Sequence, residues 1–92
     1  MTARLVGVGT YKHIAANATT LVKTGAGILK KIVIGTGAAG ATTIYDAITA
    51  AAGSEIGAIA ASATGTYQYD LQFKTGLTVV TAADNDVTVV YE

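Results

Sequence analysis

The feature that most constrains this chain is an alternation of large apolar and polar residues between Thr66 and Phe73. Tyr67, Tyr69, Leu71 and Phe73 occupy every second position, and threonine, glutamine and aspartate fill the positions between them. Successive side chains of a β-strand point to opposite faces. The pattern therefore predicts a strand with one buried face and one face in water.

Two further valine- and threonine-rich segments follow, at 77–81 and 87–91. Short polar stretches at 74–76 and 84–86 separate them and are typical of turns. From these short turns we predict that the three C-terminal strands form an antiparallel meander.

The N-terminal part is also rich in β-branched residues. We predict a first, irregular strand over Ala3 to Val8, interrupted by glycine, and another strand over Thr19 to Lys23. Thr10 to Asn17 shows no clear period, and we interpret it as a connecting loop with a possible short extended piece.

The strongest β-branched run extends from Ile28 to Gly35. In a regular strand, the isoleucines at 28, 32 and 34 share one face with Lys30. Leu29, Lys31 and Val33 then lie on the other face. We predict that the isoleucine face is buried and that Lys30 reaches water from a strand end.

The segment 42–61 fits two structures. Ile44, Ala47, Ile48 and Ala51 have helical spacing, and alanine favours helices. The β-branched and aromatic residues at 42–45 and the two glycines favour two strands instead, at 42–48 and 55–61. We prefer the two strands.

About eight short strands in 92 residues predict an all-β fold, a compact antiparallel sandwich that is jelly-roll-like. An immunoglobulin-like sandwich is the main alternative. We assign residues 1–17 to an N-terminal arm or edge strand and residues 18–92 to the sandwich domain.

Charge and hydropathy argue against nucleic-acid binding and against a membrane-spanning helix. Six basic and six acidic residues cancel, and only 13% of residues are charged, so the basic face expected of a nucleic-acid-binding protein is not predicted. No apolar run approaches the ~20 residues of a membrane helix. Because alanine, glycine and threonine dominate, the core should be thin, and we infer that other copies or a partner add stability.

No residue pattern predicts catalysis. His13 is the sole histidine, and its sequence neighbours offer no group to orient it as a base. Ser54 and Ser62 lack the sequence of a nucleophile elbow. Asp84 and Asp86 could offer oxygen ligands to Ca²⁺, but a hairpin turn in which Asp and Asn bond their own backbone is the simpler interpretation.

Residues 35–40 match the G-x-G-x-x-G dinucleotide fingerprint after a strand. The β-rich remainder has no room for the crossover helix and parallel strand that the fingerprint needs, so we interpret the stretch as a loop. We predict no catalytic residue, no metal site and no cofactor.

The remaining candidates belong to an interface. Tyr67, Tyr69 and Tyr91 fall on alternating strand positions and should pack inside, whereas Tyr11 and Tyr45 could be exposed. Tyrosine suits protein interfaces because it buries area and keeps a polar group. The predicted interface residues are Arg4, Leu5, Val6, Tyr11, His13 and Tyr45.

Several segments resemble a small family of structural proteins of tailed-phage virions. The similar stretches span most of residues 16–91: 16–29 (ANATTLVKTGAGIL), 31–34 (KIVI), 43–46 (TIYD), 65–70 (GTYQYD), 73–81 (FKTGLTVVT) and 86–91 (DVTVVY).

The resemblance implies a β-rich capsid decoration (cement) or head-fibre protein on the capsid exterior, often trimeric. It implies the major capsid protein and further copies of this chain as partners, with residues 1–17 as an arm to the shell or to a neighbouring copy. A tail or fibre module that binds host surface polymers is the alternative. A small enzyme or ligand carrier would require a buried polar pocket around His13.

Overall fold

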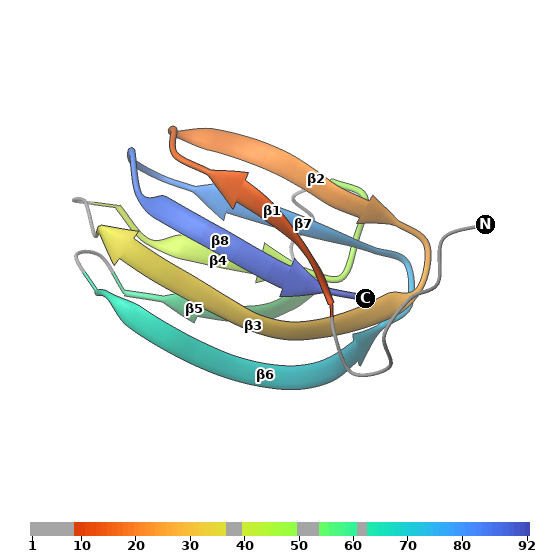
Figure 1. Ribbon diagram of the computed structural model, residues 1–92. Helices are drawn as coiled ribbons and strands as arrows, with labels where there is room; N and C mark the ends of the chain where they lie inside the picture. The colour runs from red at the N-terminus through yellow and green to blue at the C-terminus, as the bar shows by residue number, and fades with distance from the viewer. Residues whose placement is uncertain (1–8, 37–39, 50–53, 61–62) are drawn as a thin grey trace.

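Two four-stranded antiparallel β-sheets pack face to face in a computed structural model of the chain (Figure 1). The structure describes residues 9–36, 40–49, 54–60 and 63–92. Its eight strands are β1 (Thr10–Ile14), β2 (Ala18–Thr24), β3 (Gly27–Thr36), β4 (Thr42–Tyr45), β5 (Glu55–Ile59), β6 (Gly65–Phe73), β7 (Gly76–Thr81) and β8 (Asp86–Tyr91).

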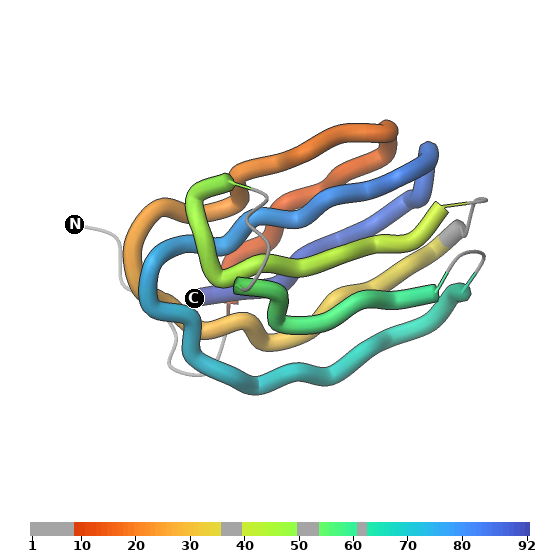
Figure 2. The backbone as a smooth tube through the Cα atoms, turned by 180° about the vertical axis from the view of Figure 1, so that it is seen from behind, coloured from red at the N-terminus to blue at the C-terminus, as the bar shows by residue number. Residues whose placement is uncertain are grey.

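The strand order is that of a jelly roll. One sheet has the order β1-β8-β3-β6, and the other, which faces the viewer in Figure 2, has the order β2-β7-β4-β5. Strand pairs β1·β8, β2·β7, β3·β6 and β4·β5 are those of one long hairpin folded back on itself between β4 and β5. Rolling that hairpin places successive pairs in opposite sheets and gives two Greek keys. The predicted jelly-roll-like sandwich is confirmed, and the immunoglobulin-like order is not found.

The predicted C-terminal meander is wrong. The strands β6, β7 and β8 exist, but none of them pairs with the next, because β7 lies in the sheet opposite to β6 and β8. The connection after β6 crosses between the sheets and meets the connection after β2, where the Gly25 amide donates to the Thr75 carbonyl at 2.9 Å. Period-two patterns fix a strand and its buried face, but they do not identify the pairing partner.

The other strand predictions have mixed outcomes. The segment 42–61 contains two strands, β4 and β5, as preferred, but β4 ends at Tyr45 and does not reach residue 48. The predicted loop over Thr10 to Asn17 contains the short extended piece that the prediction allowed, because residues 10–14 form β1 and pair with β8 along their whole length. β1 is an edge strand with one buried residue, Ile14, so its sequence shows no alternation of apolar and polar residues. The predicted strand at 3–8 lies outside the described residues.

The predicted core face of β3 is wrong before Lys30, where the strand has a β-bulge. Leu29 pairs with Tyr91 of β8 and Lys31 pairs with Val90, so Lys30 is an extra residue between them. One inserted residue exchanges the two faces of the strand. Leu29 is therefore buried and Ile28 is 41% exposed, whereas Ile32 and Ile34 beyond the bulge are buried as predicted.

The core lies between the sheets and is built from branched aliphatic residues around one phenylalanine. Tyr67, Tyr69 and Tyr91 are partly buried and pack against it, as predicted. The buried residues of this cluster are Ile14, Leu29, Ile32, Ile34, Ile44, Ile59, Phe73, Leu77, Val79, Val87 and Val89.

Two connections meet at one end of the sandwich, the one before β4 and the one before β8. Asn85, which is 3% exposed, donates from its side-chain amide to the Gly40 carbonyl at 3.0 Å and to the Thr42 hydroxyl at 3.1 Å. Gly40 fits only as glycine, because an added Cβ would lie 2.5 Å from the carbonyl carbon of Ala82. The connections before β4 and before β8 are thereby fixed to each other.

Candidate functional site

A shallow depression of about 500 Å³ lies on the outer face of the β1-β8-β3-β6 sheet. Strand register builds it: Tyr11 of β1 pairs with Val90 of β8, Val90 pairs with Lys31 of β3, and Lys31 pairs with Gln68 of β6. Paired residues of adjacent strands point to the same side of a sheet. One row of side chains therefore crosses all four strands. The lining residues are Gly9, Thr10, Tyr11, Lys30, Lys31, Gln68 and Val90.

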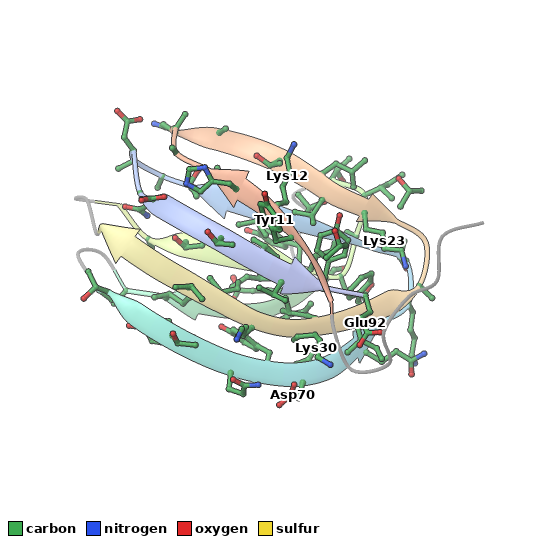
Figure 3. The ribbon with its side chains drawn as sticks, viewed as in Figure 1. Tyr11, Lys12, Lys23, Lys30, Asp70 and Glu92 are labelled. Carbon is green, nitrogen blue, oxygen red and sulfur yellow. The ribbon has the colours of Figure 1, made fainter. Side chains whose placement is uncertain are left out.

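The bulge in β3 places two consecutive lysines at this depression. In a regular strand, Lys30 and Lys31 would point to opposite faces. Because Lys30 is the inserted residue, both side chains line the outer depression. The Lys30 ammonium forms an ion pair with the Glu92 carboxylate at 3.0 Å, and Figure 3 shows these two side chains together at the end of β8.

A second bulge lies in β6 beside the first. Between the pairs Leu29–Leu71 and Lys31–Gln68, β6 has two residues where β3 has one. Asp70 takes up the distortion with a φ of 51°, a left-handed conformation that Asp tolerates better than most residues. Its carboxylate accepts a hydrogen bond from the Gln68 amide nitrogen at 3.0 Å, and this bond orients the Gln68 side chain.

The structure separates the predicted interface residues. Tyr11 and His13 lie two positions apart on β1 and are both exposed, Tyr11 at 69%. Tyr45 is half-buried at the end of β4, in the other sheet, so it is not part of a single patch with them. Arg4, Leu5 and Val6 lie outside the described residues.

His13 has a partner that the sequence did not indicate. Its Nε2 atom contacts the Asp86 carboxylate at the start of β8, 73 positions away in the chain. The register Ile14–Val87 and His13–Thr88 places β1 beside this carboxylate. Both side chains are about half exposed, at 51% and 47%, so they form a surface pair that joins an edge strand to its neighbour.

The acidic turn also differs from its predicted form. We predicted that Asp84 and Asn85 bond their own backbone, but their side chains bond other segments. The Asp84 carboxylate accepts a hydrogen bond from the backbone N–H of Asn17 at 3.0 Å, and the Asn85 side chain donates to the connection before β4. Within the described part of the chain, no three His, Asp or Glu side chains gather where they could hold a metal ion.

The glycine motif at 35–40 connects two sheets. It leaves β3 at Thr36 and enters β4 at Thr42, and β4 belongs to the opposite sheet, so the described residues on either side form no βαβ unit. Gly40 is required by its contact with the backbone at Ala82. The motif positions that fall at 37–39 lie outside the described residues.

A second depression, of about 410 Å³, lies at the opposite end of the sandwich from the acidic turn and is lined by Asp46, Ser54, Glu55, Ile56, Lys74 and Thr75. The Asp46 carboxylate accepts backbone N–H groups of Thr75 at 2.8 Å and Lys74 at 3.0 Å. These two hydrogen bonds, that from Thr75 first, lower the pKa of Asp46. The Asp46 carboxylate therefore holds the backbone of the connection between β6 and β7 in place.

Burial changes the acidity of one tyrosine. Tyr69 points from β6 over Gly57 of β5, where an added Cβ would lie 3.2 Å from the tyrosine hydroxyl. Removal from water raises the pKa of Tyr69, and Tyr67 adds to the effect. Both tyrosines serve packing between the sheets.

The chain matches no family model, no curated protein and no solved structure. Among the described residues, no helix has the length and apolar character to cross a membrane.

Proposed function

We propose that the protein is a structural protein of a tailed-phage virion that decorates the outside of the capsid and stabilises the junctions between capsomers. The observation that carries the proposal is the jelly-roll strand order. Jelly rolls include viral capsid domains. The resemblance of residues 16–91 to virion structural proteins supports the same assignment.

The exposed side of β1 is the proposed contact with the major capsid protein. Tyr11 and His13 project from this edge strand, and the His13–Asp86 contact joins the strand to β8. Tyrosine contributes area and a hydrogen bond to interfaces at little cost in conformational entropy. In the proposed assembly, three copies form a trimer, so that several weak contacts act together through effective concentration.

Co-sedimentation with empty capsids tests the proposal. Shells assembled without the protein should bind it to saturation, and the double variant Tyr11→Ala/His13→Ala should lower occupancy. The matched control Leu21→Ser alters an exposed apolar residue of the other sheet, at 46% exposure, and should retain occupancy. Absence of saturable binding to shells would contradict the proposal.

A second candidate function is adsorption to polymers of the host surface from a tail or fibre. The depression beside Tyr11 favours it, because the exposed aromatic ring offers an apolar surface to a sugar ring and the neighbouring lining side chains can hydrogen-bond to sugar hydroxyls. Gold-labelled antibody on intact virions separates the two candidates: label on heads supports decoration, and label confined to the tail supports adsorption.

A further inference from the structure

We propose that the depression on the outer face of the β1-β8-β3-β6 sheet binds an acidic polysaccharide whose sugar rings carry carboxylates. The inference rests on the adsorption function and names its ligand class. It depends on three features of the site: an exposed aromatic ring, the lysine Lys31, and an amide that is oriented by a hydrogen bond.

Tyr11 supplies a surface for the apolar face of a sugar ring. Its side chain is 69% exposed, the largest exposed fraction among the large apolar and aromatic residues that the structure describes. It lies on β1, across β8 from the lysine-bearing strand β3 (Figure 3). Between them the row has only Val90, whose small side chain forms the floor of the depression.

The charged side chains of the lining are lysines, and the carboxylates of Glu92 and Asp70 contact two lining residues, Lys30 and Gln68, from outside it. Lys30 and Lys31 are the charged residues among the lining side chains, and no acidic side chain lines the depression. Lys30 is paired with Glu92, which leaves Lys31, for which the described residues offer no carboxylate partner. A carboxylate on the ligand would form an ion pair with Lys31, and hydrogen bonds between charged groups are stronger than those between neutral groups.

Gln68 adds a directional contact. Its amide nitrogen donates to Asp70, and within the described part of the chain its amide oxygen has no hydrogen-bond partner. That oxygen can accept a hydrogen bond from a sugar hydroxyl. Because Asp70 fixes the amide, binding does not need to order this side chain, which lowers the entropic cost of association.

The dimensions fit a weak site used in many copies. A volume of about 500 Å³ is within the range of ligand sites, and its position on an open sheet face suits a segment within a long chain. Each site should bind weakly, because the ligand stays partly in water. Several copies on one particle would convert weak sites into firm attachment to a repeating polymer.

Titration with tetragalacturonate and with its fully methyl-esterified form tests the charge requirement on the same sugar backbone. Chemical-shift changes in a ¹⁵N-labelled protein should map to β1, β3 and β6 for the acid, with saturation in the millimolar range. We expect Lys31→Gln to weaken binding about tenfold and Tyr11→Ala about threefold to tenfold. Lys74→Gln is the matched control, because it removes the same charge from an exposed lysine remote from the depression.

Three results would overturn the inference: no saturable shift with the acid, equal binding of the ester, or equal weakening by Lys74→Gln. A folded amide spectrum of each variant keeps loss of binding distinct from loss of structure. Capsid co-sedimentation and virion labelling report the proposed functions independently of this titration. The protein can therefore decorate capsids without binding tetragalacturonate, or bind tetragalacturonate without decorating capsids.

Discussion

The bulge at Lys30 predicts that two adjacent isomeric residues respond very differently to the same truncation. Leu29→Ala and Ile28→Ala each remove three carbon atoms, but Leu29 is 0% exposed and Ile28 is 41% exposed. At about 0.8 kcal/mol for each buried carbon, Leu29→Ala loses about 2.4 kcal/mol of transfer free energy. The cavity it leaves raises the total to about 3 kcal/mol or more.

At Ile28 both the lost transfer free energy and the cavity contribution are smaller than at Leu29. Roughly six-tenths of the side chain is buried, so the transfer loss is about 1.4 kcal/mol at most, and water fills the space instead of a cavity. Substitution by lysine should enlarge the difference between the two positions. Ile28→Lys should fold and lose about 1 kcal/mol or less of unfolding free energy, because its ammonium reaches water. Leu29→Lys should not fold, because it places a charge in the core.

Urea unfolding followed by tyrosine fluorescence measures these differences, since the chain has five tyrosines and no tryptophan. At an m-value of about 1–3 kcal/mol per M, a loss of about 3 kcal/mol should place the midpoint of Leu29→Ala roughly 1–3 M below wild type. A loss for Ile28→Ala equal to or greater than that for Leu29→Ala would refute the bulge. That result would restore the regular strand that the sequence predicts.

Two further predictions concern the connections. Because backbone hydrogen bonds lower the folded pKa of Asp46, its stabilisation is present above the unfolded pKa of about 4 and is lost as pH falls through the folded value. Asp46→Asn should cost about 1 kcal/mol at pH 7, a figure reduced by solvent exposure. In urea unfolding, its difference from wild type should shrink as the pH falls through the folded pKa of Asp46, and a difference that stays constant over that fall contradicts the argument. Asn85→Ala should cost about 2–4 kcal/mol, because it removes two hydrogen bonds and leaves the Gly40 and Thr42 oxygens buried without them. In the same urea unfolding experiment, Asn17→Ala, at an exposed position, should lose no more than about 0.5 kcal/mol. Equal losses at the two positions would refute the role of Asn85.

The sequence was informative where a side chain's environment depends on its near neighbours. Alternation over residues 67–73 identified β6 and its inward face, and the β-branched segments at 77–81 and 87–91 identified β7 and β8. The number of strands and the absence of long helical patterns led to the sandwich. These inferences succeeded because a period of two is a local property of the extended backbone.

Pairing and register could not be inferred in this way. The meander was wrong because the turn residues after Phe73 permit either a hairpin or a crossing between sheets, and contact with the Gly25 connection selects the crossing. The inward face of Leu29 was missed because a bulge is defined by the partner strand, where Leu29 and Lys31 oppose consecutive residues of β8. The His13–Asp86 contact joins positions that are distant in the chain and carry no shared pattern.

The same division applies to the candidate site. By itself the sequence determined an all-β chain of low charge, with Tyr11 among the residues to expose. Only the tertiary structure decided that Tyr11, Lys31 and Gln68 share one row, because three strand registers and two bulges set that row. Local periodicity follows from backbone geometry within a strand, whereas a binding surface follows from how strands distant in sequence align.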